Sequence, residues 1–241
     1  MHADKEAHKS FLPGDAISSR VLFMRHPETV SNTQKFFSGR LDVELTRQGE
    51  LQRERGIAAL EAFRPDVVYC SPLSRARDMA QMAAERIGVE CVPLDDLIEY
   101  DFGPIEGMKT ADALAKGYRF PWPLDADGRS MPPEGAESLE HARARAESVL
   151  ELLRGHEGRV ACVTHGGFMR TVLAAVYDIP FGLFWNTHIL NVASLYFTCE
   201  NKGAFSLGGF NMSPEEVIAR ATEPSPYDTR DIWGTGRKEL S

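Results

Sequence analysis

Short apolar runs alternate with longer amphipathic segments along most of the chain. Four runs have the length of strands, and each ends at or just before a polar residue or a proline: 20–25, 66–70, 90–93 and 159–164. Between them, apolar residues recur at steps of three and four positions, which is typical of helices with one buried face. The helical segments are 46–63, 71–87, 138–154 and 166–176. This alternation predicts an α/β fold, a three-layer α/β/α sandwich around a mostly parallel sheet.

Residues that favour helix ends mark the limits of these segments. Thr46 is suited to cap the first helix, and Ser71 with Pro72 is interpreted as the N-cap and first residue of the second. Two further strand-like runs, 191–198 and 204–210, are joined by a short polar turn. That tight connection predicts an antiparallel pair at the edge of the sheet.

The pattern weakens at both ends and in one internal segment. Residues 1–19 are polar and aperiodic and are interpreted as a flexible N-terminal tail, and residues 20–212 form the single predicted domain. Residues 213–241 begin with a capping box, which predicts a short helix before an extended C-terminal tail. Residues 118–133 are rich in aromatic side chains and proline and have no period, so we interpret them as a rim or lid over a site.

Charge and composition exclude several classes of protein. The net charge is −8 and the isoelectric point is near 5.4, which argues against nonspecific nucleic-acid binding. No apolar run is long enough to cross a bilayer, and the first ten residues lack the apolar core of a secretory signal. We expect reduced, buried thiols, no cysteine metal site and a cytoplasmic location, because the cysteines lie in or beside apolar runs and lack CxxC spacing. The cysteines are Cys70, Cys91, Cys162 and Cys199.

Side chains suited to binding an anion follow three of the predicted strands. Ligands of open α/β sheets bind at the carboxyl ends of the strands, where these side chains would meet. Arginine is a bidentate donor for phosphate oxygens, and the free N–H groups of a helix start favour anions. The pattern therefore predicts an anion site with one histidine as a candidate nucleophile, where the arginines would repel a metal cation. The residues are Arg25, His26, Arg75, His165, Gly166 and Gly167.

Five segments resemble motifs of the histidine phosphatase superfamily, also called the phosphoglycerate-mutase-like family. FMRHPETVSN resembles the family's Arg-His-Gly-x-Thr-x-x-Asn motif, and SPLSRARDMA resembles its Ser-x-Leu-x-Arg-Ala motif. LIEYDFGPIEG resembles the segment that bears the family's acid, PPEGAESLEHARAR the Gly-Glu-Ser start of a helix, and VTHGG the second histidine motif. The similarity spans residues 20–210, and it implies the phosphoglycerate-mutase-like form of the sandwich.

The resemblance implies a phosphomonoester hydrolase of the phosphatase branch, with a small-molecule substrate and no metal or cofactor. Its implied nucleophile is His26, which attacks the phosphorus and becomes a phosphohistidine. Its implied acid is Glu99, which protonates the leaving alkoxide and then deprotonates the attacking water. The implied contacts to the phosphoryl oxygens are Arg25, Asn32, Arg75, His165 and Gly166.

Three features of the sequence leave alternatives open. Pro27 stands where the family has glycine, and it removes a backbone N–H that a phosphate can use. Asp101 competes with Glu99 for the role of the acid. A cofactor-dependent phosphoglycerate mutase is the first rival function, although the long basic inserts expected of one are not visible after Gly107. A catalytically weak phospholigand-binding protein is the second, and it follows if Pro27 has spoiled the pocket.

Overall fold

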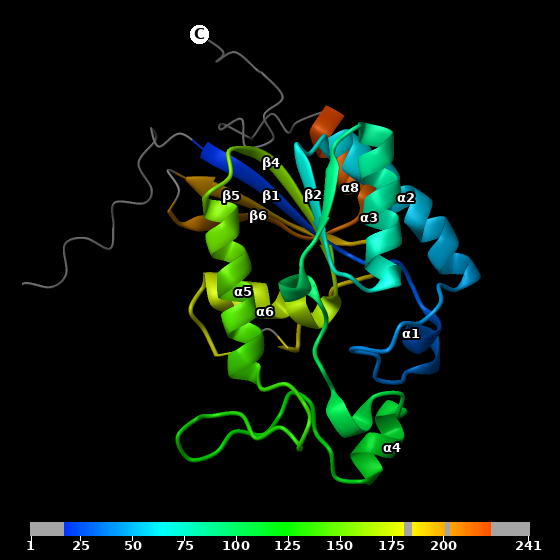
Figure 1. Cartoon of the computed structure of the whole chain (residues 1–241), viewed down its shortest axis with the longest axis vertical. Coiled ribbons are helices and arrows are strands. Elements are labelled where there is room, and N and C mark those ends of the chain that lie inside the picture. Colours follow the sequence, from blue (N-terminus) through cyan, green and yellow to red (C-terminus); the bar gives the residue numbers. More distant parts are fainter. Residues whose placement is uncertain (1–16, 181–184, 201–202, 223–241) are drawn as a thin grey trace, which may run out of the picture.

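A six-stranded mixed sheet runs through the molecule and carries helices on both faces (Figure 1). The computed structural model describes residues 17–180, 185–200 and 203–222. In chain order the elements are β1 Ile17–Arg25, α1 Val30–Gln34, α2 Arg47–Phe63, β2 Val67–Cys70, α3 Ser74–Ile87, β3 Glu90–Pro93, the 3-10 turns η2 Asp95–Leu97 and η3 Gly103–Ile105, α4 Thr110–Ala115, α5 Leu139–Arg154, β4 Gly158–Thr164, α6 Gly166–Val176, β5 Ser194–Glu200, β6 Phe205–Met212 and α8 Pro214–Thr222.

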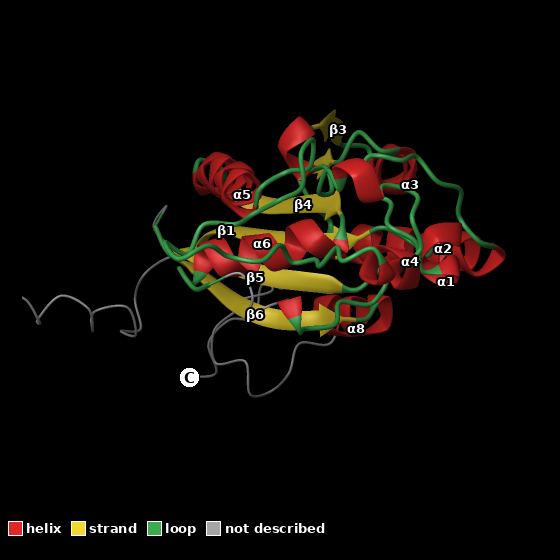
Figure 2. Ribbon diagram, turned by 90° about the horizontal axis from the view of Figure 1, so that it is seen from below, coloured by secondary structure: helices red, strands yellow, loops and turns green. Residues whose placement is uncertain are grey.

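The order of the strands places β1 in the interior of the sheet. Neighbouring strands follow the order β3-β2-β4-β1-β5-β6, which Figure 2 shows from below. β1 pairs in parallel with β4 and antiparallel with β5, while β2 pairs in parallel with β3 and with β4. β5 and β6 form the antiparallel pair that the sequence predicted. The predicted fold class, a mostly parallel α/β/α sandwich with an antiparallel edge, is therefore confirmed.

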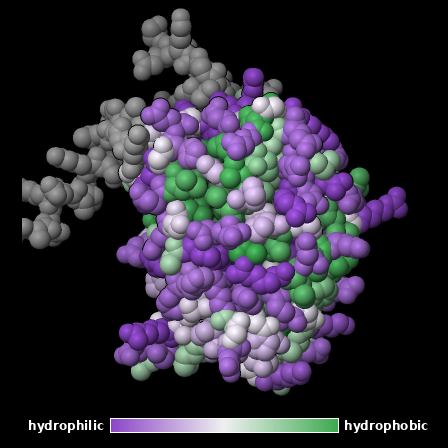
Figure 3. Space-filling view, viewed as in Figure 1, coloured by the Kyte–Doolittle hydropathy of each residue, from purple (hydrophilic) through white to green (hydrophobic). Residues whose placement is uncertain are grey.

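Alternate residues of β1 build the two halves of the core. Val21 and Phe23 belong to the half that is covered by α5 and α6, and Leu22 and Met24 to the half that is covered by α2 and α3. All four side chains are fully buried. Figure 1 shows these helix pairs on opposite sides of the sheet, and Figure 3 shows a mainly hydrophilic outer surface with hydrophobic positions between α5 and α3. A strand that is buried on both faces has a continuous apolar sequence, as this one does.

The helix α3 begins later than the sequence predicted from Ser71 and Pro72. Its first residue is Ser74, which donates its backbone N–H (3.1 Å) and its hydroxyl (2.6 Å) to the carboxylate of Asp42. The cap therefore comes from a distant segment, which the local pattern does not reveal. The hydroxyl of Ser71 makes a different contact, with the ring of His165 (2.7 Å).

The structure moves the N-terminal limit of the predicted domain and contains the helix predicted after its C-terminal limit. β1 begins at Ile17, so it includes the last residues of the predicted tail 1–19. The predicted capping box is present at α8, where Ser213 donates its N–H to Glu216 (2.7 Å) and accepts from the N–H of Glu216 (3.2 Å). The remaining tail residues, 1–16 and 223–241, lie outside the described part of the chain.

The aromatic segment 118–133 contributes in part to a small core, a different role from the predicted rim or lid. Trp122 is 3% exposed, and its indole N–H donates to the carbonyl oxygen of Glu137 (2.7 Å). Phe120 packs edge-on against Trp122 and against Phe102, with ring centres 4.7 and 4.9 Å apart. This packing has no period that a sequence pattern can show, because the loop backbone is irregular.

The cysteines agree with the expectation of reduced thiols. All four cysteines are free thiols, and three of them are buried while Cys91 is half-buried. The sulfur atoms of Cys70 and Cys91 lie 3.7 Å apart on neighbouring strands, too far for a disulfide bond. No helix within the described ranges is long and apolar enough to cross a membrane.

Truncation of Phe23 tests the place of β1 in the core. Phe23→Ala should lower the free energy of unfolding by about 3–5 kcal/mol, because it removes a fully buried ring and leaves a cavity. The control is Leu51→Ala in α2, whose side chain is 60% exposed and whose loss should change stability by less than about 0.5 kcal/mol. Urea unfolding followed by circular dichroism measures both. Equal effects of the two substitutions would contradict the described core.

Candidate active site

His26 lies just beyond the carboxyl end of β1, between a parallel and an antiparallel neighbour. Its backbone N–H donates to the carbonyl of Thr164 in β4 (2.9 Å). Its carbonyl accepts from the side-chain amide of Asn191 (3.1 Å) and from the N–H of Val192 (3.4 Å), in the segment that leads to β5. The backbone of His26 is therefore held from both sides, and the residue is 5% exposed.

The ring of His26 is held in one tautomer. Its Nδ1 lies 2.6 Å from the carbonyl oxygen of Pro27, and a carbonyl can only accept, so Nδ1 carries the proton. Burial lowers the pKa of His26 well below its usual range, and the charges of Arg75 and Arg25 lower it further. At neutral pH the ring is therefore uncharged, and Nε2 has a lone pair available for attack.

Two arginines place positive charge beside this ring, and backbone carbonyls hold both. Arg25 donates from Nη1 to the carbonyl of Ile189 (2.7 Å). Arg75 is 3% exposed and donates to the carbonyls of Leu41 (2.7 Å) and Gly39 (2.9 Å). Burial lowers the pKa of Arg25 to about 10, which leaves it protonated at neutral pH. Carbonyl groups position the guanidinium groups without cancelling their charge, so that charge remains available to an anion.

The loop that holds Arg75 is in turn held by Glu106. The Glu106 carboxylate accepts the backbone N–H groups of Gly39 (3.0 Å) and Arg40 (2.9 Å). Glycine is required at position 39, because a Cβ atom there would lie 1.7 Å from the carbonyl oxygen of Tyr100. Glu106 therefore acts on the site indirectly, through the carbonyls that orient Arg75.

His165 directly follows β4 and is the N-cap residue of α6. Its Nε2 lies 2.7 Å from the hydroxyl oxygen of Ser71, and its ring centre lies 5.2 Å from that of His26. Burial lowers the pKa of His165 well below its usual range, and the charge of Arg75 is the next cause. Both rings are therefore neutral at pH 7, and Ser71 orients the second one.

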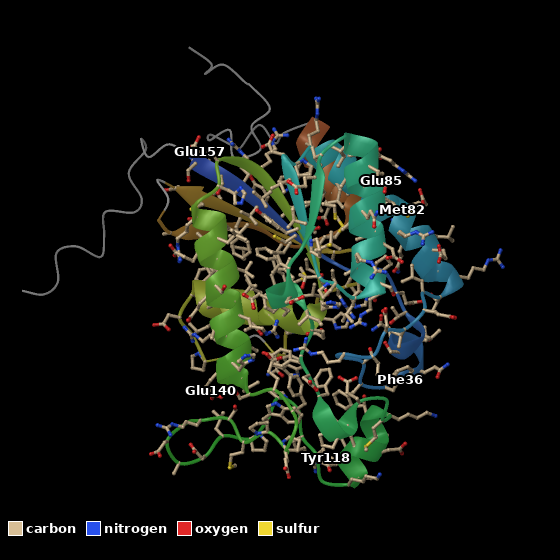
Figure 4. All side chains as sticks on the ribbon, viewed as in Figure 1. Phe36, Met82, Glu85, Tyr118, Glu140 and Glu157 are labelled. Atoms are coloured by element: carbon tan, nitrogen blue, oxygen red, sulfur yellow. The ribbon has the colours of Figure 1, made fainter. Side chains whose placement is uncertain are left out.

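Three buried nitrogen atoms around His26 have no hydrogen-bond partner among the described residues. They are Nε of Arg25, Nε of Arg75 and Nδ1 of His165. Leaving a buried polar group unpaired costs about 1–3 kcal/mol, and native proteins keep few such groups. The two arginine atoms can only donate. With their charges, they form a site for a small anion that has several oxygen atoms, in the region where Figure 4 shows side-chain nitrogens gathered between α3 and α6.

Glu99 lies in the loop after η2, and its carboxylate reaches the start of α6. Its carboxylate accepts the backbone N–H groups of Gly167 (2.9 Å) and Phe168 (3.0 Å). Glycine at position 167 makes this approach possible, because a Cβ atom would lie 2.4 Å from Oε1 of Glu99. The charge of Glu99 is the leading acidic influence on both Arg25 and Arg75. Glu99 is therefore the carboxylate of the anion site.

Asp101, the competing acid, occupies a different position. Its Oδ1 accepts the N–H of Gly103 within its own turn (2.8 Å), and its Oδ2 lies 3.9 Å from Nε of Arg40. Its side chain is 41% exposed. Its charge is not among those that shift His26 or Arg75. The geometry therefore favours Glu99 as the acid of the site.

Asn32 and Gly166 lie next to residues of the site. Oδ1 of Asn32 accepts from the N–H of Thr29 (3.1 Å) and from the amide of Asn191 (3.1 Å), the same amide that contacts His26. Gly166 packs on Arg25, since a Cβ atom at position 166 would lie 3.1 Å from Nε of that arginine. Direct contact of either residue with a bound anion stays a prediction.

The donor set of this site suits an anion better than a metal ion. No group of three or more His, Cys, Asp or Glu side chains within the described segments is placed to hold a metal ion. The charges of Arg25 and Arg75 favour an anion over a cation beside His26. The chemistry open to the site is transfer of an anionic group to and from Nε2.

Sequence reasoning found the central residues and missed the ones that support them. The local pattern at Ser71 indicates only a helix cap, and Glu106 is one of several acids in its segment, so neither carries a signal of its role. Arg170, one turn into α6, was also missed, although its charge acts on Arg25. The predicted residues that the structure brings together are Arg25, His26, Arg75, Glu99 and His165.

Comparison with known proteins shows which family, sequences and solved structures this chain resembles. The sequence profile of the histidine phosphatase superfamily (branch 1) matches residues 21–212. A bifunctional protein of Mycobacterium tuberculosis is 33% identical over 190 residues, which cover 73% of this chain and 49% of that protein. The chain therefore spans about half the length of that curated relative.

Two further relatives carry out different reactions according to their names. A 2,3-bisphosphoglycerate-dependent phosphoglycerate mutase of Brucella ovis is 29% identical over 169 residues, which cover 66% of this chain and 82% of the mutase. The solved structure of a mycobacterial glucosyl-3-phosphoglycerate phosphatase complexed with VO3 is 29% identical and has a TM-score of 0.68. That comparison covers 82% of this chain and all of the other.

The two buried histidines predict that stability falls in acid. Each folded-state pKa lies below the unfolded value of about 6.5, so the unfolded chain binds more protons between those two values. The free energy of unfolding should be unaffected by these rings well above pH 6.5. It should fall as the pH drops below about 6.5, by up to about 1.4 kcal/mol per pH unit for each ring.

Urea unfolding at pH 7.5, 6.5 and 5.5 measures this slope. His26→Asn should make the slope shallower, because it removes one of the two neutral buried rings. Leu51→Ala is the control, since it changes an exposed side chain without a titratable group, and it should leave the slope unchanged. Equal slopes for the wild type and His26→Asn would contradict the described state of His26.

Proposed function

The chain belongs to the histidine phosphatase superfamily, and we propose that it hydrolyses phosphomonoesters through a phosphohistidine formed on His26. The observation that carries the proposal is the state of His26: buried, neutral, and protonated on Nδ1 by its bond to Pro27. That bond leaves the Nε2 lone pair next to buried, unpaired donors of Arg25 and Arg75. A neutral nucleophile beside a set of unpaired anion donors suits attack on a phosphoryl group.

In the first step, Nε2 of His26 attacks the phosphorus and the bond from phosphorus to the ester oxygen breaks. The transition state of phosphoryl transfer is loose, so its main requirements are alignment and stabilisation of charge on the phosphoryl oxygens. Arg25, Arg75 and His165 supply donors for those oxygens. Glu99, in its acid form, gives a proton to the departing ester oxygen. The products are an alcohol and a phosphohistidine.

In the second step, water attacks the phosphorus and the bond to Nε2 breaks. Glu99, now a carboxylate, accepts a proton from the water as it attacks. Inorganic phosphate leaves, and His26 returns to its neutral tautomer, held by the carbonyl of Pro27. The covalent intermediate divides one difficult hydrolysis into two easier displacements.

Pro27 has a defined part in this scheme despite its difference from the family motif. It offers no backbone N–H to a phosphoryl oxygen. Its carbonyl oxygen lies 2.6 Å from Nδ1 of His26 and fixes the proton on that nitrogen, and this function does not need an N–H. We therefore expect Pro27 to be compatible with catalysis, and we favour an active enzyme over a phospholigand-binding protein. Turnover of a generic aryl phosphate separates these two functions.

A phosphoglycerate mutase is the alternative function within the same family. The similarity to the Brucella ovis mutase supports this alternative. A mutase returns the phosphoryl group from histidine to an alcohol, whereas a phosphatase gives it to water. Incubation with 3-phosphoglycerate separates them, because isomer exchange indicates a mutase and release of inorganic phosphate indicates a phosphatase. We propose the phosphatase, as the chain lacks long basic inserts after Gly107.

Removal of the nucleophile should abolish turnover. His26→Ala should lower kcat by a factor on the order of 10⁴ or more, because the covalent route is lost. The assay measures phosphate release from a panel of phosphomonoesters. His188→Ala, at an exposed histidine, is the control. Retained activity in His26→Ala would overturn the mechanism, and loss of wild-type activity on addition of a chelator would overturn its independence of metal.

Removal of the acid should depend on the leaving group. Glu99→Gln should slow hydrolysis of alkyl phosphates by roughly 10²- to 10⁴-fold, because their alkoxide needs a proton to depart. Aryl phosphates have better leaving groups and should lose much less. Asp101→Asn is the matched control and should alter neither substrate by more than about threefold. Equal slowing of both substrates by Glu99→Gln would contradict its role as the acid.

A further inference from the structure

A buried ion pair joins α5 to the loop before it, and the proposed mechanism does not use it. Glu137, two residues before the first residue of α5, and Arg145, in the second turn of that helix, are each 7% exposed. Arg145 donates to the carboxylate of Glu137 from Nε (2.7 Å) and from Nη2 (2.8 Å). Desolvating two charges costs free energy, and this cost is offset only when the other donors and acceptors of the pair also have partners. The backbone on either side of Glu99 provides three of these partners.

The arginine of this pair holds the segment that leads to Glu99. Nη1 of Arg145 donates to the carbonyl of Asp96 (2.8 Å) and to the carbonyl of Ile98 (2.9 Å). The second of these carbonyls belongs to the peptide bond that joins Ile98 to Glu99. The carbonyl between them accepts from the buried hydroxyl of Thr164 in β4 (2.5 Å). Three consecutive carbonyls before Glu99 are therefore fixed in direction, two of them by one side chain.

The glutamate of the pair holds the segment that follows Glu99. The backbone N–H of Glu137 donates to the carbonyl of Asp101 (2.8 Å), and its Oε2 accepts the backbone N–H of Asp101 (3.3 Å). The backbone of Glu137 is fixed in turn, because its carbonyl accepts the indole N–H of Trp122 (2.7 Å). The pair therefore holds the chain on both sides of Glu99, one residue before it and two residues after it.

The carboxylate of Glu99 meets the start of α6, which Arg145 also contacts. Its oxygens accept the N–H groups of Gly167 (2.9 Å) and Phe168 (3.0 Å). The guanidinium carbon of Arg145 lies 5.1 Å from the centre of the Phe168 ring. Arg145 therefore connects the loop that carries Glu99 to the helix start that receives its carboxylate.

The contacts of Arg145 require a planar guanidinium. Four of its five N–H donors are used, two for the carboxylate of Glu137 and two for backbone carbonyls. A lysine ammonium carries the same charge but has its three donors on a single nitrogen, so it cannot reach both sets of acceptors. The charge of Arg145 also lowers the pKa of His165. A lysine substitution therefore separates the placement of the loop from the effect of the charge.

We propose that Glu137 and Arg145 are positioning residues for Glu99, and that they affect the reaction through the placement of its carboxylate. The inference rests on the proposed hydrolase function, in which Glu99 is the acid, and extends it to the residues that keep the acid in place. In the described structure neither side chain has a hydrogen bond to His26 or to the two arginines beside it. Loss of the pair should therefore affect turnover in the same way as loss of Glu99.

The dependence of hydrolysis on the leaving group tests this placement. The double variant, Arg145→Met with Glu137→Gln, removes both charges and leaves neither buried alone. It should lower kcat/KM for alkyl phosphates by roughly 10- to 100-fold, because a misplacement of about 1 Å at a reacting group can cost about 100-fold. Aryl phosphates have better leaving groups and should lose much less. Arg145→Lys should also slow alkyl phosphates more than aryl ones, since it keeps the charge without the planar donors.

The matched control is Arg143→Gln. It removes an arginine from the same helix, but this arginine pairs with Glu147 and Asp178, whose side chains are 57% and 91% exposed. Both kinds of substrate should be hydrolysed at the wild-type rate, because the loop of Glu99 keeps its contacts. Urea unfolding of every variant ensures that activities are compared among folded proteins.

Combination with Glu99→Gln identifies the route of the effect. The double variant made in Glu99→Gln protein should add no further loss to the ratio of alkyl to aryl rates, because the residue through which the pair acts is already changed. A further loss as large as in the wild-type background would overturn the inference. Equal slowing of alkyl and aryl phosphates would overturn it as well. So would a wild-type alkyl rate in Arg145→Lys, because the charge alone would then be sufficient.

Hydrogen exchange measured by NMR separates failure of the positioning pair from failure of the proposed function. The amides of Gly167 and Phe168 donate to Glu99, whereas the amide of Met169 donates to the carbonyl of His165 (2.9 Å). In the double variant the first two amides should exchange roughly tenfold faster relative to that of Met169. This change supports the pair even if the wild type hydrolyses no phosphomonoester. Unchanged exchange overturns it even if the wild type is an active phosphatase.

Discussion

Hydrogen bonds from arginine to backbone carbonyls are the interaction on which the site depends. Carbonyls of residues 39 and 41 hold Arg75, that of Ile189 holds Arg25, and those of Gly166 and Thr187 hold Arg170. A carboxylate in any of these places would fix the side chain equally well but would cancel its charge. Carbonyls give direction and leave the charge for a ligand. Burial lowers the pKa of His26, and the charges of Arg75 and Arg25 lower it further, so the ring is neutral at pH 7.

The sheet explains how these distant residues come together. β1, β2 and β4 run in the same direction, so the residues that follow them reach one edge: His26 after β1, Ser71 after β2 and His165 after β4. The contact between Ser71 and His165 links the second and third of these strand ends across the sheet. Glu106 then stabilises the loop that covers the edge through the N–H groups of Gly39 and Arg40. The site is therefore a product of strand direction first and of loop packing second.

This division also explains what the sequence could predict. β1 and the residues Arg25 and His26 were accessible, because an apolar run and the polar pair that follows it are adjacent in the chain. The start of α3 was not, since Asp42 provides its cap from another loop. The burial of Trp122 was not accessible either, because it depends on a contact with Glu137 in irregular structure. Arg170 had the sequence appearance of an ordinary surface residue of an amphipathic helix.

The segment 185–193 holds several residues of the site through its own hydrogen bonds, and this limits which sequence changes the protein can accept. Its carbonyls hold Arg170 at Thr187 and Arg25 at Ile189, and Asn191 holds the backbone of His26. An insertion there would move His26, Arg25 and Arg170 together. Phe120 packs edge-on against Trp185 from the segment 118–133, which has no hydrogen bond to His26 among the described residues. Changes of sequence in 118–133 should therefore disturb the site less than changes in the length of 185–193.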